Sequence, residues 1–457
     1  MTVRRKIAPP GADRVREAAF DVLRAVDARD AYANLVLPEL LRERGLDGRD
    51  AALATELVYG TLRGRGAYDA VLAANLDRAL GELDPPVLDA LRLGAHQLLA
   101  TRIPAHAAVS TTVDLTRARI GEGPGKLVNA VLRRVSAHDL ESWIEQIAPA
   151  ASTDPVERLA LRHSHPPWIV RAMLDALGGD LEELERALAA DNERPEVTLV
   201  ARPGRADVAE LLEAGARPGR WSPYAAVLAD GDPADLPAIR ERRAGVQDEG
   251  SQLVGLALAA VPLTGPDQRW LDMCAGPGGK AALLGGLATQ RGSHLLAVEQ
   301  QPHRARLVEK ALREDPGSHR VLVADSTQPL VGEQPFDRVL LDAPCTGLGA
   351  LRRRPEARWR RRPGEVAGLR ALQVRLLRAA VEAVRPGGVI AYATCSPHLA
   401  ETSTVVSDVL RDRADLDRMD ARQYLPDMPD LAGGLDVQLW PHRHGTDAMY
   451  LALLRRR

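Results

Sequence analysis

From about residue 246 onward, short apolar runs alternate with helical patterns, and this alternation most constrains the fold of the chain. Helices are predicted from Lys280 and over Pro302–Leu312 and Leu369–Val384. The predicted strands are Trp270–Met273, Leu295–Glu299, Arg320–Asp325, Phe336–Asp342 and Gly388–Thr394. Strands that alternate with helices form a parallel, doubly wound sheet. Residues 246–457 are therefore predicted to form an α/β domain.

Polar side chains stand at or just after the carboxyl ends of these strands. They are Asp272, Glu299, Asp325, Asp342 and Cys395. Ligands of doubly wound sheets bind beyond the carboxyl ends of the strands, so we expect these five groups to converge on one edge. Each of the first three acids could instead cap the following helix. Three such acids in succession favour a ligand site.

The segment Gly276–Gly279 can turn tightly and let a ligand approach the backbone. It lacks the G-x-G-x-x-G spacing of a dinucleotide fold. It also fails as a phosphate-binding loop, because Ala281 follows Lys280 and Cys274 occupies the first glycine position. A nucleoside without a phosphate chain remains, with Glu299 on the ribose hydroxyls and the acid at position 325 on the adenine amino group. S-adenosylmethionine meets these demands.

The first 245 residues follow other patterns. Residues 1–13 are predicted to be disordered, and residues 14–145 to form an all-helical bundle because their leucines recur at helical spacing. Residues 150–245 mix the two patterns, with helices over Trp168–Leu177 and Asp207–Ala216 and a strand over Val197–Ala201. The middle segment is therefore predicted to be a small α+β module.

The bulk composition limits the classes of function. The formal net charge is −2, so any contact with nucleic acid must come from local patches. The three cysteines form neither a disulfide framework nor a C-x-x-C zinc pair, and His442 and His444 have no third ligand nearby in the sequence. We expect no metal. No apolar run reaches about 20 residues and no signal core follows the basic N-terminus, so we expect a cytoplasmic protein without a membrane span.

Each cysteine lies inside a dense motif, and these motifs carry a resemblance. The motifs are Val246–Gln252 (VQDEGSQ), Cys274–Lys280 (CAGPGGK), Leu341–Gly347 (LDAPCTG) and Tyr392–Ser396 (YATCS). As an ordered group they resemble the RNA (cytosine-C5)-methyltransferases with two active-site cysteines, the Nol/Nop/Sun class. The helical segment is similar to the NusB-like RNA-binding domain of the bacterial Sun (Fmu) proteins. Its matching stretches are Leu57–Arg63 and Val128–Arg133.

The resemblance implies a Rossmann-like methyltransferase domain that methylates a cytosine of 16S ribosomal RNA, of the cytosine-967 type, with S-adenosylmethionine as cofactor. It assigns the nucleophile to Cys395, product release to Cys345 and stabilisation of the base near N3 to Asp342. The implied cofactor residues are Cys274, Ala275, Gly276, Pro277, Gly278, Gly279, Lys280, Glu299, Asp325 and Asp342. Cys274 is interpreted as pocket wall, and Lys280 as a holder of Asp342 or of the base. We expect a monomer whose partner is 16S rRNA.

Three segments depart from the family pattern. Ala393 stands where serine is common, Pro397–Ser403 keeps only Glu401 of the usual Glu-Glu-Asn run, and Thr446–Tyr450 replaces Asp-Gly-Phe-Phe. Leu351–Arg370, which contains eight arginines and Trp359, is expected to receive RNA by gripping phosphates and stacking a base.

Two alternatives remain open at this stage. One is the same chemistry on transfer RNA, although the NusB-like segment favours ribosomal RNA. The other is a non-catalytic RNA-binding or ribosome-assembly factor, which the intact cysteine pair disfavours.

Overall fold

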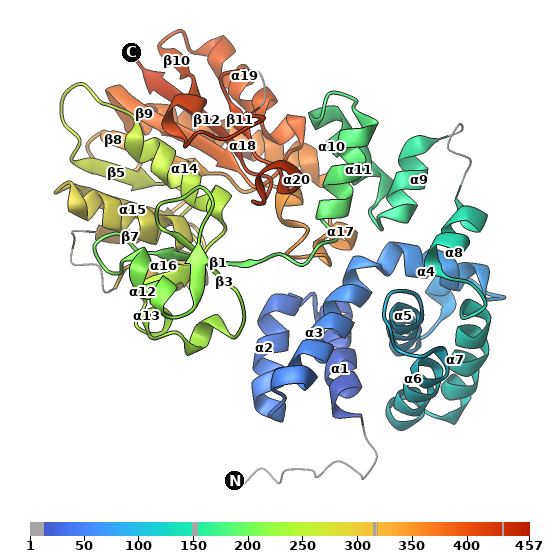
Figure 1. The fold of residues 1–457 in the computed structure, drawn as a ribbon. Coiled ribbons are helices and arrows are strands. Elements are labelled where there is room, and N and C mark those ends of the chain that lie inside the picture. Colours follow the sequence, from blue (N-terminus) through green and yellow to red (C-terminus); the bar gives the residue numbers. More distant parts are fainter. Residues whose placement is uncertain (1–12, 149–153, 314–316, 318, 432–433) are drawn as a thin grey trace. The chain divides into compact units, whose positions relative to one another are not determined.

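The computed structural model describes residues 13–148, 154–313, 317, 319–431 and 434–457 (Figure 1). The chain divides into two compact units. The first comprises Met1–Arg171 with Arg353–Arg360, and the second comprises Ala172–Arg352 with Arg361–Arg457. The tail predicted to be disordered lies outside the described residues, except for Asp13.

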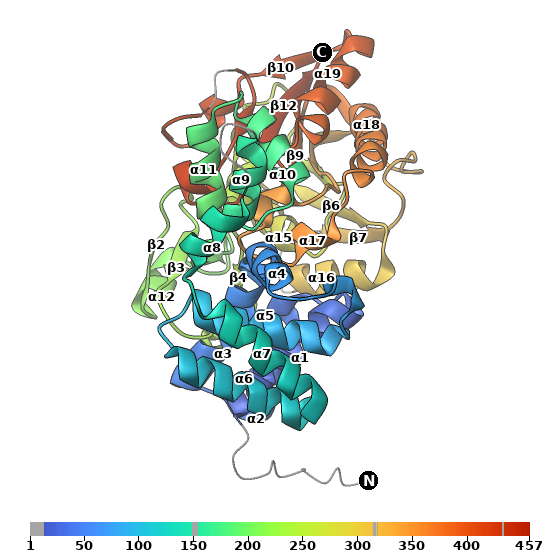
Figure 2. The ribbon, with the colours of Figure 1, turned by 90° about the vertical axis from the view of Figure 1, so that its right-hand side faces the viewer.

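The first unit is helical, as the leucine spacing predicts. Its helices in the N-terminal segment are α1 (Arg14–Arg29), α2 (Ala33–Arg44), α3 (Gly48–Arg63), α4 (Arg65–Ala74), α5 (Pro85–Leu99), α6 (Ala105–Arg119), α7 (Glu122–Val135), α8 (Leu140–Ile147) and α9 (Pro155–Arg162). One apolar core joins α1, α2 and α3, and a second joins α4, α5, α6 and α7. Figure 2 shows α5, α6 and α7 packed side by side.

A short segment from far along the chain completes this unit. It comprises Arg353–Arg360, includes helix α17 (Ala357–Arg360), and is called the strap below. Glu356 Oε1 accepts a hydrogen bond from Ala33 N at the start of α2 (3.2 Å). Arg360 donates to the carbonyls of Val26 (2.8 Å) and Ala31 (2.7 Å), at and just beyond the end of α1. The strap thus presents an acid to a helix N-terminus and a cation to a helix C-terminus, as the helix dipole favours.

The second unit contains the doubly wound sheet. Its strands lie in the order β10-β12-β9-β8-β5-β6-β7. Their bounds are β5 (Arg269–Asp272), β6 (His294–Glu299), β7 (His319–Val323), β8 (Phe336–Asp342), β9 (Val384–Thr394), β10 (Leu416–Met419) and β12 (Tyr450–Arg456), with β11 (Val437–Gln438) paired to β12. Wherever two of the five predicted strands pair with each other, they run parallel. The sheet is nevertheless mixed, because β12 runs antiparallel to β9 and to β10.

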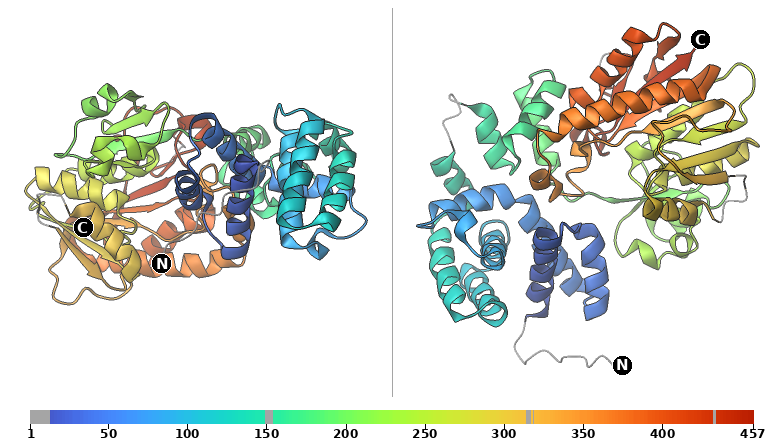
Figure 3. Two further views of the ribbon diagram at one scale, coloured as in Figure 1. Left: turned by 90° about the horizontal axis from the view of Figure 1, so that it is seen from below. Right: turned by 180° about the vertical axis from the view of Figure 1, so that it is seen from behind.

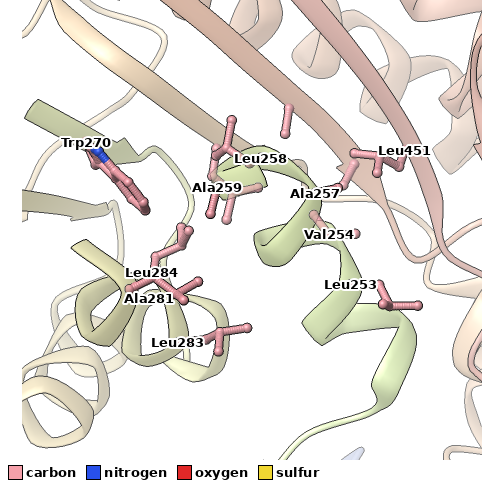
Figure 4. Close-up of a cluster of buried hydrophobic side chains, with 14 of the residues drawn as sticks. Leu253, Val254, Ala257, Leu258, Ala259, Trp270, Ala281, Leu283, Leu284 and Leu451 are labelled. Atoms are coloured by element: carbon pink, nitrogen blue, oxygen red, sulfur yellow. The ribbon is translucent and has the colours of Figure 1, made fainter. Parts of the chain in front are cut away.

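Apolar helices cover both faces of this sheet. Helices α14 (Glu249–Ala260), α15 (Gly279–Gln290) and α16 (Pro302–Leu312) share one core with the sheet, and α18 (Glu365–Ala383) and α19 (Ser403–Asp412) share the other. Figure 3, right, shows the long helix α18 along its face of the sheet. Figure 4 shows the opposite core, where Leu258 of α14 and Leu284 of α15 approach Trp270 of β5. Leu340 belongs to one core and Leu341 to the other, as the alternation of side chains along a strand requires.

The middle segment supplies further elements of both kinds. Helices α10 (Pro167–Ala176) and α11 (Leu181–Ala190) precede an antiparallel sheet of order β2-β3-β1-β4. Its strands are β1 (Val197–Ala201), β2 (Ala216–Pro218), β3 (Ala225–Leu228) and β4 (Ala244–Val246). The helix predicted over Asp207–Ala216 is shorter, α12 (Val208–Glu213), because Ala216 already pairs with Leu228 of β3. Short helices α13 (Pro237–Arg240) and α20 (Pro441–His444) complete the unit.

Candidate active site

The carboxyl ends of the parallel strands meet along one edge of the sheet. Asp342, the last residue of β8, pairs with Ala393 of β9, two residues before Cys395. Asp272, the last residue of β5, pairs with Leu340 of β8 and with Ala297 of β6. Glu299 ends β6 opposite Val323, the last residue of β7, and exposed Asp325 follows two residues later. The predicted convergence of the strand ends is therefore present in the sheet register.

Two of the three thiols lie against each other. The Sγ atoms of Cys345 and Cys395 are 3.5 Å apart, and both side chains are partly buried. Cys345 lies three residues beyond the end of β8, and Cys395 directly follows β9. Adjacent parallel strands thus deliver both cysteines to the same point on the edge of the sheet.

A largely buried cation lies beside this thiol pair. Lys280 Nζ donates to Asp342 Oδ2 at 2.8 Å. Burial disfavours the charged form of Lys280, but the adjacent Asp342 carboxylate outweighs burial and raises the lysine pKa. Lys280 therefore remains an ammonium that fixes the Asp342 carboxylate.

The electrostatics separate the two thiols. The hydrogen bond with Cys345 lowers the pKa of Cys395, and nearby Lys280 acts in the same direction against burial and Asp342. The same hydrogen bond, together with burial, raises the pKa of Cys345. Because the thiolate is the reactive form of cysteine, these opposite shifts favour a thiolate at Cys395 over one at Cys345.

Cys274 has a different environment. Burial, followed by the charge of Asp272, raises its pKa well above the usual range. Its side chain packs against the apolar core beneath α18. Cys274 is therefore a protonated thiol packed against the core.

The glycine turn and Glu299 are built around each other. Gly276 N donates to Glu299 Oε2 at 3.1 Å, and a Cβ atom at position 276 would lie 2.2 Å from the same oxygen. Gly278 has a φ of 114° and directly precedes α15, where a side chain would be strained. A side chain at position 276 would displace the Glu299 carboxylate, and one at position 278 would strain the backbone, so both positions favour glycine.

One buried carboxylate oxygen at this edge has no hydrogen-bond partner in the described part of the chain, and it bears on whether S-adenosylmethionine fits here. Asp272 is 1% exposed, and its Oδ2 has no hydrogen-bond partner among the described residues. Burial and the neighbouring Asp342 raise the pKa of Asp272 to about 7. Its Oδ1 accepts from Cys274 N at 3.3 Å, but a buried carboxylate oxygen without a partner is costly unless a donor or cation reaches it. The ammonium and sulfonium groups of S-adenosylmethionine would add positive charge to an edge where Asp342 and Glu299 both raise the pKa of Asp272, so the residues fit the cofactor.

Sequence reasoning left out one buried residue beside the thiols. Glu401 lies in the short turn after Cys395 and is completely buried. Its carboxylate accepts hydrogen bonds from Thr346 N (2.8 Å) and Ser396 Oγ (2.7 Å), the residues that follow the two cysteines. One sequence signal could have indicated its importance: Glu401 is the residue of the usual Glu-Glu-Asn run that this chain keeps.

The arginine-rich segment is largely used inside the protein. Arg358 is completely buried and donates to the carbonyls of Arg63 and Ser164 (3.3 Å each). Arg352 bonds Asp447 (2.9 Å) and Asp248 (3.0 Å). Arg352 and Arg358 are therefore held inside the protein, Arg354 and Arg362 are exposed, and RNA binding by this segment stays a prediction.

The histidines near the C-terminus also have intramolecular partners. His442 Nε2 lies 2.6 Å from Glu183 Oε2, and His444 Nδ1 accepts from Trp440 N at 2.9 Å. Within the described ranges no group of three His, Cys, Asp or Glu side chains could hold a metal ion. Among all the residues that the structure describes, no helix is long and apolar enough to cross a membrane.

Comparison with known proteins joins these features. A family model described as 16S rRNA methyltransferase RsmB/F matches residues 261–455, and the NusB family model matches residues 13–137. A Bacillus subtilis protein, named probable ribosomal RNA small subunit methyltransferase B, is 31% identical over 97% of this chain and 99% of its own. This chain belongs to the RsmB/F family of 16S rRNA methyltransferases. As a member of the RsmB/F family it is an S-adenosylmethionine-dependent RNA methyltransferase with an N-terminal NusB domain.

A second relative and two solved structures were also found to be similar to this RsmB/F protein. A Mycobacterium tuberculosis protein named as a putative methyltransferase is 54% identical over 97% of both chains. The solved structure of PH0851 has a TM-score of 0.80 at 22% identity and covers 98% of this chain and 99% of its own. NSun6 from Pyrococcus horikoshii, solved with SFG, has a TM-score of 0.53 at 17% identity and covers 64% of this chain and 98% of its own. These two structures show the shared fold.

Proposed function

We propose that this RsmB/F protein methylates C5 of a cytosine in 16S rRNA, of the cytosine-967 type, through a covalent bond between Cys395 and C6 of the base. The observation that carries the proposal is the contact of the two thiols at 3.5 Å beside the Lys280–Asp342 ion pair. Two relatives are named as ribosomal RNA small subunit methyltransferase B or as a probable one, and these names support RNA as the substrate.

The proposed steps follow from the reactivity of cytosine. C5 of the aromatic ring is a poor nucleophile, and addition of the Cys395 thiolate at C6 places electron density on C5. Asp342 hydrogen-bonds the ring edge near N3, and a proton shared between its carboxyl group and N3 offsets the negative charge that thiolate addition places there. When bound, S-adenosylmethionine supplies the electrophilic methyl group. A base, either water or Cys345 in its thiolate form, then takes the C5 proton. The C5–H electron pair forms the C5–C6 double bond as the C6–S bond breaks, which restores the Cys395 thiolate, and Cys345 assists this release.

The cofactor residues form the second part of the proposal. The turn Cys274–Lys280 contacts the cofactor through its backbone, and Glu299 accepts from the ribose hydroxyls. Exposed Asp325 accepts from the adenine amino group, and Asp342 lies between cofactor and base. Because Glu299 Oε1 and Oε2 already each accept one backbone N–H (Gln301, 2.9 Å; Gly276, 3.1 Å), its remaining lone pairs have a fixed direction.

The division of labour along the chain is also proposed. Residues 14–145 form the NusB-like RNA-binding domain, 150–245 a linking α+β module, and 246–457 the methyltransferase domain. We propose that the protein acts as a monomer in the cytoplasm, where ribosomal RNA is made and thiols stay reduced.

In vitro methylation with bisulfite sequencing tests the proposed function. Purified protein is incubated with S-adenosylmethionine and either a 16S rRNA transcript or a transfer RNA transcript, and each RNA is sequenced after bisulfite treatment. We expect one protected cytosine in the 16S transcript, and none when Cys395→Ala replaces the wild type. Protection only in transfer RNA would overturn the substrate, and full protection by Cys395→Ala would overturn the nucleophile.

A further inference from the structure

Glu401 connects the two loops that carry the thiols. Its Oε1 accepts from Thr346 N (2.8 Å) and Gln373 Nε2 (3.2 Å), and its Oε2 accepts from Thr346 Oγ1 (2.5 Å) and Ser396 Oγ (2.7 Å). Its own carbonyl accepts from Tyr392 OH of β9 (2.7 Å). Four donors fill the lone-pair capacity of a carboxylate.

The positions of these donors matter more than their number. Thr346 directly follows Cys345, and Ser396 directly follows Cys395. A single carboxylate therefore holds the residue next to each thiol, on loops that leave two adjacent strands, β8 and β9. Gln373 of α18 bonds both Glu401 and the carbonyl of Pro344 (2.8 Å), which adds a second support to the loop that carries Cys345.

The thiol contact needs such a support. Thiol hydrogen bonds are weak, so the 3.5 Å separation cannot hold two loops in place by itself. Hydrogen bonds to a buried carboxylate are stronger and directional. Resting on the proposed function, we propose that Glu401 is a positioning residue that sets the register of Cys345 against Cys395 and so makes Cys395 the selective nucleophile.

The charged groups that face Cys395 define what Glu401 can change. Cys345, Asp342, Lys280 and Asp447 act on the Cys395 thiol directly. Glu401 acts on the pair through Cys345, whose pKa its charge helps to raise. Loss of the carboxylate therefore makes the two thiols more alike, and a loosened contact reduces the donation from Cys345 to Cys395.

Site-resolved alkylation of the full-length protein tests the proposal without any RNA. Wild type and Glu401→Gln are treated with iodoacetamide between pH 6 and 10, and modification of each cysteine is followed by peptide mass spectrometry. In the wild type we expect Cys395 to react before Cys345. In Glu401→Gln we expect the ratio of the two rates to fall roughly tenfold, which corresponds to about one pKa unit between the thiols.

A matched variant separates positioning from general stability. Glu249 is also a buried carboxylate, and it accepts from Trp221 N (2.6 Å) and Ser222 N (2.8 Å) rather than from either cysteine loop. Glu249→Gln should lower the melting temperature while preserving the alkylation ratio. If Glu401→Gln does not fold, Ser396→Ala replaces it, because it removes one donor and keeps the carboxylate. An unchanged ratio in a folded Glu401→Gln, or in Ser396→Ala when that variant replaces it, overturns the proposal.

Steady-state methylation provides the functional readout. For Glu401→Gln we expect kcat to fall roughly tenfold or more with the KM for S-adenosylmethionine nearly unchanged, because the cofactor turn is not touched. Thr346→Ser keeps the hydroxyl and should retain kcat, whereas Thr346→Val should lower it. A wild-type protein that alkylates as expected but methylates no RNA would defeat the proposed function alone. A loss confined to KM would instead defeat the role of Glu401.

Discussion

Cys345 and Cys395 bring their Sγ atoms to 3.5 Å although 50 positions separate them in the chain. The contact is asymmetric, because it lowers the pKa of Cys395 and raises that of Cys345. The contact thereby favours the thiolate form at Cys395 and the protonated form at Cys345.

Replacement of Cys345 should trap the RNA on the enzyme. If Cys345 assists release, Cys345→Ala should accumulate a Cys395-linked RNA that survives a denaturing gel. The double variant Cys345→Ala/Cys395→Ala should give none, and Cys274→Ala should behave as wild type. A Cys345→Ala protein that turns over normally without an adduct would contradict the release role.

Oxidation should join the same two thiols. Diamide removes two electrons and two protons from a close dithiol and becomes the hydrazine, so we expect one intramolecular disulfide and loss of methylation. Dithiothreitol should restore activity, and intact-mass spectrometry should show a loss of about two mass units in wild type and Cys274→Ala. Cys345→Ala should not lose this mass, and if it does the disulfide involves another pair.

Removal of the Lys280 charge should shift the pH profile. Since the reaction needs the Cys395 thiolate, kcat/KM rises as pH increases through the Cys395 pKa. Lys280→Met removes a cation that lowers this pKa and leaves Asp342 uncompensated, so the ascending limb should move to higher pH by about one unit. Activity near pH 7 should fall roughly tenfold and partly recover at pH 9. An equal loss at every pH would mean that Lys280 does not act through the thiol.

Neutralisation of Asp272 should stabilise the cofactor-free protein at alkaline pH. The pKa of Asp272 in the folded protein, about 7, lies above that of an unfolded aspartate. The folded state therefore binds this proton more tightly, and the resulting stability is complete below about pH 4 and lost as pH rises through 7. At pH 8.5 the buried charge costs roughly 3 to 4 kcal/mol, so Asp272→Asn should raise the free energy of unfolding there by up to that amount.

Urea unfolding at two pH values measures this effect. At pH 5 Asp272→Asn should match the wild type much more closely than at pH 8.5. Exposed Asp325 provides the control, because Asp325→Asn should leave the unfolding free energy unchanged at both values. Calorimetry should show weaker S-adenosylmethionine binding by Asp272→Asn. Equal stability of Asp272→Asn and wild type at pH 8.5 would refute the buried charge.

Loss of Arg358, the completely buried arginine of the strap, should destabilise the helical unit. Arg358→Met removes the donor to the carbonyls of Arg63 and Ser164, which are left in a buried site at a cost of roughly 2 to 4 kcal/mol. Limited proteolysis should then cleave residues 13–171 faster than in wild type. Arg354→Met, at an exposed position that stacks on Tyr32, should change little. Equal proteolysis of both variants would exclude a structural role for Arg358.

The parallel part of the sheet and its acidic edge could be predicted because both depend on local order. An apolar run predicts a strand of a doubly wound sheet, and the polar residue at the end of that run marks the carboxyl end of the strand. Asp272, Glu299 and Asp342 can therefore be placed at strand ends from the sequence. Strand β12 was not, because Tyr450–Leu454 is an apolar run without a register signal and its antiparallel direction depends on pairing with β9.

The sequence by itself determined which chemical groups the edge of the sheet carries, since motif composition is a property of the chain alone. Only the tertiary structure decided which of them touch: Cys345 with Cys395, and Lys280 with Asp342. The tertiary structure also places Glu401 in hydrogen-bond contact with both cysteine loops. It buries Arg358 completely, so that this side chain is not accessible to RNA. Hydrogen bonds and pKa values depend on distance and burial, and neither is fixed until distant segments pack together.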